Sequence, residues 1–152
     1  MRDTDAHARG ILDDTTYVVL ATASQDGHPW ATPVWFAHDG LDRLYWVSWP
    51  GSRHSQLIAQ RPDIGLTVFD THAVPQEGTA FYAVAQAREC TDEELDEGLS
   101  VFNRRARAQG LGQFTRDRVT EDARLRLYVA EIDEAWVLDQ DAEFDQRAQV
   151  PL

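Results

Sequence analysis

The chain has 152 residues, which is the size of one domain, and its 26 acidic against 14 basic residues give a formal net charge of -12. Every basic residue is an arginine, so the chain contains no lysine. A charge this negative argues against general DNA, RNA or anionic-membrane binding, which needs a basic surface, but a small anionic ligand needs only one positive pocket.

Residue usage excludes further classes of protein. The single cysteine, Cys90, excludes an internal disulfide and a cysteine-rich zinc site. No apolar run reaches the roughly 20 residues of a membrane span. Residues 1–5 lack the basic-then-apolar order of a signal peptide. We therefore expect a soluble, cytoplasmic, single-domain protein, with residues 1–14 as a leading segment and residues 140–152 as a loose tail.

Runs rich in β-branched and aromatic residues, separated by turn signals, predict six or seven strands. They lie at residues 15–24, 30–38, 44–48, 64–70, 79–90, 125–132 and 135–139. Asp-Gly pairs at 26–27 and 39–40 join the first three strands into an expected antiparallel meander. Pro33 removes a hydrogen-bond donor from the second strand, which suggests an edge, a bulge or a backbone that faces a ligand.

Three segments predict helices. A short leading helix is expected over residues 4–13, and a second, over 52–60, begins with serine, a good N-cap, and stops before Pro62. The third begins with a capping box at 91–94, carries one apolar stripe and ends at Gly110. Because helices do not alternate with strands, the pattern favours a mainly β barrel or sandwich over a doubly wound α/β fold.

The most informative segment runs from residue 45 to 57, where a strand ends, a Pro-Gly turn follows and a helix begins. The first turn of a helix presents unpaired N–H groups and the positive end of the helix dipole. Hydroxyls of Ser48 and Ser52 add donors. Arg53 offers a planar fork for two phosphate oxygens, and His54 can donate. These groups predict a phosphate site; the alternative is a capped structural helix with a solvated arginine and histidine.

Other groups carry weaker signals. Four tryptophans could stack on a planar ring or fill a core or a subunit interface: Trp30, Trp35, Trp46 and Trp49. The histidines lack the close spacing of a metal set, and no Gly-rich phosphate loop or GxSxG motif is present. Three arginines near the end of the third helix, where cations are favoured, are expected to be structural: Arg104, Arg105 and Arg107.

The order of these segments resembles the FMN-binding split-barrel family of pyridoxamine 5′-phosphate oxidases. The resemblance rests on the hairpin ATASQDGHPWATPVWFAHDG, the segment LYWVSWPGSRHSQLIAQRPDIGLTVFD, and the strand that ends at Cys90 before TDEE. It covers residues 15–95 well and the final strands more loosely. It implies a mainly β fold, a six-stranded antiparallel Greek-key split β-barrel with a few flanking helices, and a homodimer with two flavins at the subunit interface.

The resemblance also implies which residues bind the cofactor. Five residues at the end of the third strand and in the following turn would hold the flavin phosphate: Val47, Ser48, Ser52, Arg53 and His54. The second strand would lie along the isoalloxazine and the ribityl chain with Thr32, Pro33, Val34 and Trp35. Trp136 would approach the flavin from the partner subunit. No catalytic acid or base can be named, and no metal is expected.

Two departures from the family pattern bear on function. The family's lysine after the arginine is His54 here, which predicts weaker or pH-dependent phosphate binding. The authentic vitamin B6 enzymes are longer and carry a C-terminal Arg-x-His substrate segment, which residues 144–152 do not show. Pyridoxamine 5′-phosphate is therefore not the expected substrate. Short members of the family include reductases that use FMN or the deazaflavin F420, and haem-handling proteins.

We therefore expect an FMN-dependent oxidoreductase that transfers a hydride through flavin N5 to or from an unidentified small molecule. Two alternatives stay open. The first is an F420-dependent reductase on the same fold, in which the arginines at 104–107 could accept the acidic tail of F420. The second is a non-enzymatic protein that binds flavin or haem. Neither nucleic acid nor a membrane is an expected partner.

Overall fold

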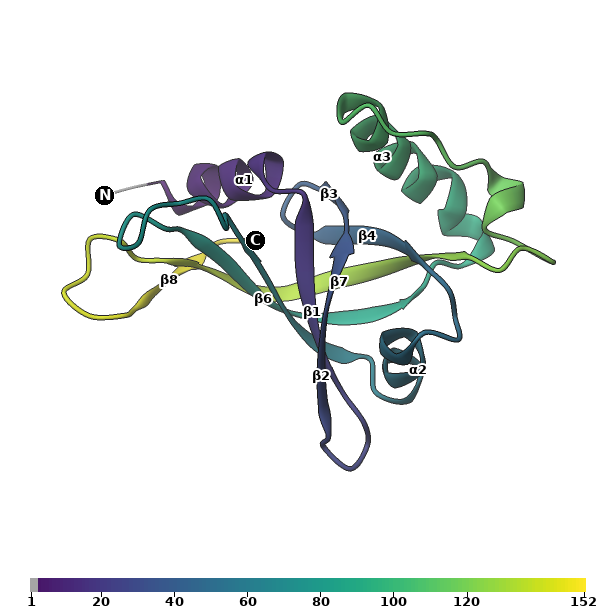
Figure 1. Ribbon diagram of the computed structural model, residues 1–152, viewed down its shortest axis with the longest axis horizontal. Coiled ribbons are helices and arrows are strands. Elements are labelled where there is room, and N and C mark those ends of the chain that lie inside the picture. Colours follow the sequence, from purple (N-terminus) through teal and green to yellow (C-terminus); the bar gives the residue numbers. More distant parts are fainter. Residues whose placement is uncertain (1–2) are drawn as a thin grey trace.

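The computed structural model describes residues 3–152, and its central feature is one antiparallel sheet. The strands are β1 Tyr17–Ala23, β2 Pro29–Trp35, β3 Ala37–Asp39, β4 Arg43–Ser48, β5 Asp63–Phe69, β6 Ala80–Glu89, β7 Arg126–Leu138 and β8 Arg147–Val150. They follow the order β2-β1-β5-β6-β7-β4-β3, with β8 paired to β7. In Figure 1 the long strands β6 and β7 run across the molecule, and β1 and β2 cross them steeply.

The two ends of this strand order are consecutive in the chain. β2 lies at one end and β3 at the other, and only Phe36, which is fully buried, separates them. The sheet therefore curls back on itself around an apolar side chain. This corrects the expected meander, because the strand predicted over 30–38 divides at Phe36: its first part pairs with β1 and its second part with β4.

The mainly β fold with a curled antiparallel sheet is confirmed, with eight strands among residues 3–152 where six were expected. Part of the difference is the division at Phe36. The rest is β8, which forms inside the segment predicted to be a loose tail and buries Val150. The two strands predicted at the end of the chain are one strand, β7, because a bulge opposite Val84 and Ala85 absorbs Asp133.

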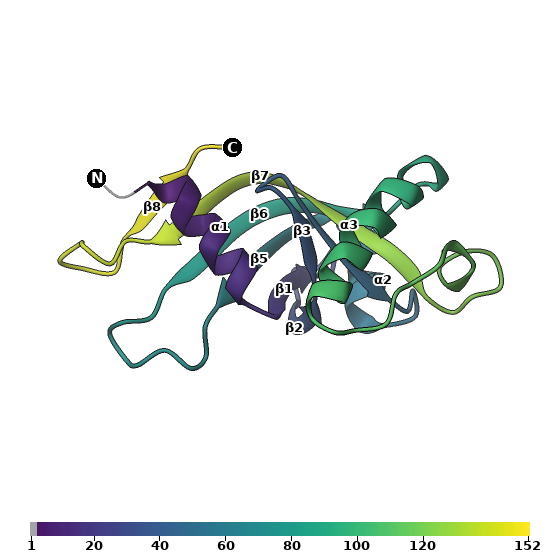
Figure 2. The same cartoon turned by 90° about the horizontal axis from the view of Figure 1, so that it is seen from above.

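Three helices flank the sheet, as the sequence predicts: α1 Thr4–Asp14, α2 Arg53–Gln60 and α3 Leu95–Ala108. Figure 1 shows α1 and α3 above the sheet and α2 below its right-hand part, and Figure 2 shows that α1 and α3 cross the strands at separate places. The predicted capping box is present, since the carboxylate of Glu94 accepts from Thr91 N–H at 2.8 Å, but it opens a 3-10 turn before α3.

No helix in the described part of the chain is long and apolar enough to cross a membrane. Met1 and Arg2, on which the expectation of no signal peptide partly rests, lie outside the described residues.

Two apolar clusters lie on opposite faces of β4 and β7, because alternate side chains point to opposite faces of a strand. Leu44 and Trp46 belong to the cluster inside the curled sheet, whereas Tyr45 belongs to the cluster under α3. The helix approaches the sheet closely at Gly98, where a Cβ atom would lie 2.8 Å from Leu127 Cδ2. The predicted apolar stripe of α3 is buried, with Leu95, Leu99 and Phe102 in this second cluster and Ala106 beyond it.

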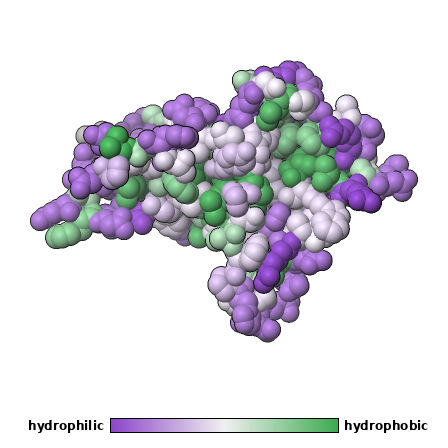
Figure 3. All heavy atoms as spheres, in the orientation of Figure 1, coloured by the Kyte–Doolittle hydropathy of each residue, from purple (hydrophilic) through white to green (hydrophobic). Residues whose placement is uncertain are grey.

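The outer face of β1, β5 and β6 carries apolar side chains that stay exposed. Tyr17 is 58% exposed and Phe69 is 43% exposed. Val19, Tyr82 and Trp136 lie in one cross-strand row on this face. Figure 3 shows apolar surface gathered in the middle of the molecule, between more polar ends. Apolar patches of this kind commonly mark a binding surface.

Candidate functional site

The predicted phosphate turn lies at the N-terminus of α2, directly after β4. Ser52 is the N-cap, as predicted: its hydroxyl accepts from Ser55 N–H at 3.3 Å, and its carbonyl accepts from Gln56 N–H at 3.0 Å. The backbone N–H groups of Arg53 and His54 have no acceptor among the described residues. The helix therefore begins with two unpaired donors at the positive end of its dipole.

A chain of small polar side chains lies beneath the turn. His54 Nε2 is 2.8 Å from Ser48 Oγ and 3.3 Å from Ser52 Oγ. The Ser52 hydroxyl donates to Ser55 Oγ at 2.8 Å, and Ser55 hydrogen-bonds the phenol of Tyr128 on β7. Ser48 and Ser55 are buried. These contacts hold the end of β4, the turn, the start of α2 and β7 in one arrangement.

His54 contributes position rather than charge. Burial lowers the pKa of its imidazole below the ordinary value, because a charged ring would lose hydration. The ring is therefore neutral at pH 7, and its Nε2 faces the hydroxyls of Ser48 and Ser52. Contact between His54 and a phosphate stays a prediction.

Arg53 supplies the positive charge of the turn. Its exposed guanidinium lies over the indole of Trp30 on β2, 4.4 Å from the ring centroid. No carboxylate in the described part of the chain forms an ion pair with Arg53. An uncompensated guanidinium and two unpaired N–H groups therefore lie in one turn, which is the donor set that binds a phosphate.

β2 runs from this turn to the end of α3. Trp30 meets Arg53 near the start of the strand, and at its end the Trp35 Nε1–H donates to Gln109 Oε1 at 2.6 Å. Trp35 also packs edge-to-face on Phe102, with ring centroids 4.7 Å apart. The five-residue step between the two tryptophans spans roughly 16 Å.

The predicted strip of Thr32, Pro33, Val34 and Trp35 lies on this strand and is half-buried or exposed. β2 is at one end of the strand order, so the edge position that Pro33 suggested is confirmed. Val47, the remaining residue of the predicted phosphate set, is half-buried beside the cluster under α3.

A groove of about 470 Å³ borders the strip at Pro33. Val19 pairs with Pro33 in the β1–β2 ladder and forms its floor with Tyr17 and Phe69. Two carboxylates and one histidine lie at its polar end: Asp14, Asp70 and His72. Apolar walls beside a strand edge suit a planar organic ring.

Trp136 is not brought to this site within one chain. Trp136 pairs with Tyr82 on one side and Gln149 on the other. Arg126, which pairs with Ser48 next to the turn, is ten residues before Trp136 on β7. Ten residues of strand span roughly 33 Å. A contact between Trp136 and a cofactor at α2 would therefore require a second chain, and it stays a prediction.

Sequence reasoning missed the roles of four residues at this site. Trp30 was not expected to contact Arg53, and Arg126 was not expected opposite Ser48. The contributions of Ser55 and Tyr128 were also not predicted. Ser55 could have been found from its position three residues after the N-cap. The others come from strands that pair or pack only in the folded chain, so the spacing of residues carries no signal for them.

The arginines at 104–107 divide into two kinds. Arg105 donates to the carbonyl of Leu12 at 2.8 Å and lies over the ring of Phe36, so its predicted structural role is confirmed. Arg104 and Arg107 are exposed on the last turns of α3.

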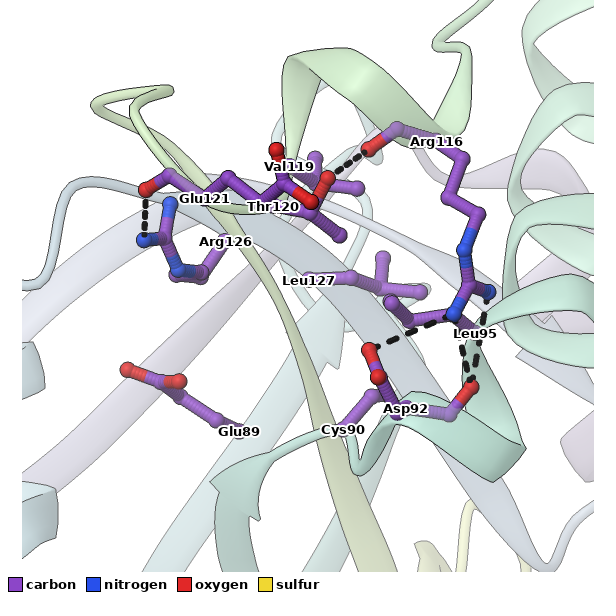
Figure 4. Close-up of a pocket in the computed structure, with 10 residues that line it drawn as sticks. All are labelled: Glu89, Cys90, Asp92, Leu95, Arg116, Val119, Thr120, Glu121, Arg126 and Leu127. Atoms are coloured by element: carbon purple, nitrogen blue, oxygen red, sulfur yellow. Dashed lines mark hydrogen bonds and ion pairs between the residues drawn. The ribbon is translucent and has the colours of Figure 1, made fainter.

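A second groove, of about 250 Å³, lies between the end of β6, two 3-10 turns and the start of β7 (Figure 4). Arg116 NH1 is 3.2 Å from Asp96 Oδ1, and Arg116 NH2 is 3.2 Å from Asp92 Oδ1. Arg126 donates to the backbone carbonyl of Glu121 at 2.9 Å. Burial raises the pKa of the Cys90 thiol to about 12. Arg116 is therefore paired with carboxylates, the donors of Arg126 are taken up by backbone carbonyls, and the Cys90 thiol stays protonated.

Comparison with known proteins covers almost the whole chain. Residues 4–139 match the model of the family described as pyridoxamine 5′-phosphate oxidase. No curated protein matches the chain. A solved haem-binding protein from Mycobacterium smegmatis is similar with a TM-score of 0.72 and 16% identity, over 98% of this chain and 59% of that one.

Two further solved structures share the fold. An FAD-binding protein from Mesorhizobium loti has a TM-score of 0.62 at 17% identity, over 87% of this chain and 91% of its own. An F420 reductase has a TM-score of 0.61 at 18% identity, over 84% of this chain and 94% of its own. Because the three structures differ in the cofactor they are named for, the fold alone does not select one.

Proposed function

Because the chain belongs to the pyridoxamine 5′-phosphate oxidase family, we propose that it is an FMN-dependent oxidoreductase acting on a small molecule. The observation that carries the proposal is the start of α2, where Arg53 and two unpaired N–H groups lie together without a carboxylate. Such a turn binds a phosphate group. When bound, FMN would supply hydride transfer through its N5.

The residues around the turn fit such a cofactor. Ser52 carries its hydroxyl at the start of α2, Ser48 lies buried beneath it, and the His54 ring contacts both hydroxyls. The partly exposed strand β2 borders an apolar groove. A ribityl chain and a planar ring would lie along this strand and its groove. The chain's own contribution is thus to hold the phosphate at α2, to direct the ring along β2 and to shield it with apolar side chains.

We further propose a homodimer with the cofactor at the subunit interface. The apolar outer face of β1, β5 and β6 supports this, because Tyr17 and Phe69 are exposed there. The distance of Trp136 from α2 within one chain also supports it. The proposed setting is the cytoplasm, with neither nucleic acid nor a membrane as partner, in keeping with the net charge of -12. Sedimentation equilibrium tests the dimer, and a monomer at all concentrations would contradict it.

The test of the cofactor compares two ligands that differ only in the phosphate. FMN and riboflavin are titrated into the protein, and binding is followed by quenching of flavin fluorescence. We expect FMN to bind at least tenfold more tightly, because riboflavin has no group for Arg53 and the free N–H groups. A purified protein that is colourless and takes up no FMN would refute the proposal.

An F420-dependent reductase is the second candidate, and one observation favours it. Arg104 and Arg107 are exposed near Gln109, which contacts Trp35 at the end of β2 opposite to the phosphate turn. An acidic tail that extends along β2 could reach them. Tighter binding of F420 than of FMN, lost on replacing both arginines with methionine, would select this candidate. Tight flavin or haem binding without oxidation of any reduced cofactor would select a non-enzymatic binder.

A further inference from the structure

We propose that Trp30 is a positioning residue for Arg53, and that this contact sets the affinity of the α2 turn for the cofactor phosphate. The inference rests on the proposed function, because it concerns the same anion site. Trp30 and Arg53 are far apart in sequence and meet only where β2 packs beside α2.

The backbone of Trp30 is held firmly although its ring is 40% exposed. Trp30 pairs with Thr22 in the β1–β2 ladder, and the Thr22 hydroxyl donates to the Trp30 carbonyl at 3.2 Å. Thr22 is itself buried. The indole therefore projects from a fixed point of the sheet, and the Arg53 guanidinium lies against its face.

A guanidinium stacked on a ring uses its face and leaves its edge available. Arg53 Cζ lies over the Trp30 ring, and none of the five N–H donors of its guanidinium has a hydrogen-bond acceptor within residues 3–152. Among the described residues, the Arg53 side chain donates no hydrogen bond and pairs with no carboxylate. Arg88, by contrast, spends both terminal nitrogens on the carboxylate of Glu94, at 2.7 Å each.

Stacking also restricts the side chain before a ligand arrives. A free arginine would lose much of its rotamer freedom when it binds phosphate, and a side chain that is already ordered loses less. No other cation can take over this task in the turn, since Arg53 is the only arginine between Arg43 and Arg61 and the chain has no lysine. The position of this one side chain therefore decides the strength of the site.

The experiment measures the ratio of the dissociation constants of riboflavin and FMN, which cancels effects on the ring site. We expect Trp30→Leu to lower this ratio about threefold to tenfold, and Trp30→Phe to restore most of it because a ring remains. Phe144→Leu is the control for loss of an exposed aromatic ring: Phe144 is 71% exposed and lies between β7 and β8, outside the α2 turn. It is expected to leave the ratio unchanged.

A double-mutant cycle with Arg53→Met separates positioning from general destabilisation. If Trp30 acts through Arg53, Trp30→Leu has no further effect on the ratio in the Arg53→Met background. An unchanged or raised ratio in Trp30→Leu, or an equal loss in both backgrounds, would overturn the inference. If Trp30→Leu does not fold, as judged by circular dichroism, Trp30→Met takes its place in the cycle, because it also lacks a ring and the same loss is expected.

Failure of the proposed function has a different signature. If wild type binds neither flavin, inorganic pyrophosphate is titrated into wild type, Trp30→Leu and Arg53→Met, and the change in heat on binding is recorded by calorimetry. A change that requires both Trp30 and Arg53 would retain the positioning role without the flavin. The lack of any change in wild type would overturn both proposals.

Discussion

The α2 turn and the groove of Figure 4 hold arginines in opposite states. In the α2 turn, the guanidinium of Arg53 lies on an aromatic face and meets no carboxylate. In the groove of Figure 4, Arg116 bridges Asp92 and Asp96, and Arg126 donates to backbone carbonyls. An arginine is therefore not enough for anion binding. Its guanidinium must also be free of carboxylate partners.

Burial acts in both regions by favouring neutral forms. It raises the pKa of the Cys90 thiol in one and lowers the pKa of the His54 imidazole in the other. The α2 turn therefore owes its charge to Arg53 alone, and the groove of Figure 4 contains a protonated thiol.

The rate of thiol labelling at Cys90 is expected to change most. A thiol pKa of about 12, against the ordinary 9.0, makes the thiolate fraction roughly a thousandfold smaller at pH 8. We expect an aromatic disulfide reagent to label the native protein several hundredfold more slowly than the protein in 6 M guanidinium chloride. Native labelling as fast as that of a free cysteine would show that the groove is reactive after all.

Arg53→Met is expected to weaken FMN binding about tenfold to a hundredfold, because a charge-assisted hydrogen bond contributes about 1.5–3 kcal/mol. Arg116→Met is the matched control, since its guanidinium is already neutralised by carboxylates. It should leave FMN binding unchanged, as measured by the same fluorescence titration. Equal losses in the two variants would mean that net charge, and not the turn, governs binding.

The Arg88–Glu94 pair tests the same idea through stability. Hydrogen bonds from Arg88 hold the pKa of Glu94 at about 2, well below its ordinary 4.5, so the ionised form stabilises the fold. This contribution is complete above pH 4.5 and is lost as the pH falls towards 2. Glu94→Gln should lower the free energy of unfolding by about 1 kcal/mol at pH 7. Urea titrations at pH 7, 4 and 2.5 should show the difference vanishing, and a constant difference would argue against the pair.

Of these changes, the one expected for His54 is the smallest: its burial makes the free energy of unfolding fall at acidic pH. The pKa of the His54 imidazole is lowered in the folded protein. Below about pH 6.5 the unfolded chain therefore binds a proton at this ring more readily than the folded protein does, so the free energy of unfolding falls. Any stability advantage of wild type over His54→Gln should therefore shrink between pH 8 and pH 5, as followed by urea unfolding. An advantage that grows as the pH falls would show that His54 is charged in the fold.

Local signals in the sequence were sufficient for much of this architecture. Ser52 is the N-cap of α2, and Gly27 and Gly40 take φ angles of 86° and 57° in the two predicted Asp-Gly turns. Caps and tight turns depend on a few neighbouring residues, so they can be read from the chain directly. The donors of the α2 turn follow from the same local geometry.

Pairing between distant segments was not readable in this way. The bend at Phe36 depends on β1 and β4 competing for the two halves of one apolar run. β8 forms in a polar segment because backbone hydrogen bonds to β7 need no apolar side chains. Burial of a residue such as His54, and hence its charge, also depends on what packs around it.

Strand periodicity, turn chemistry and helix caps are local properties, so the sequence was enough to predict a mainly β chain and a capped helix start with one arginine after the third predicted strand. The folded structure was needed to show that Arg53 lies on Trp30, that His54 is neutral beside Ser48 and Ser52, and that Arg116 in the groove of Figure 4 is paired with carboxylates. Those outcomes depend on which distant groups meet and on how much water they exclude, and charge and affinity follow from these two factors.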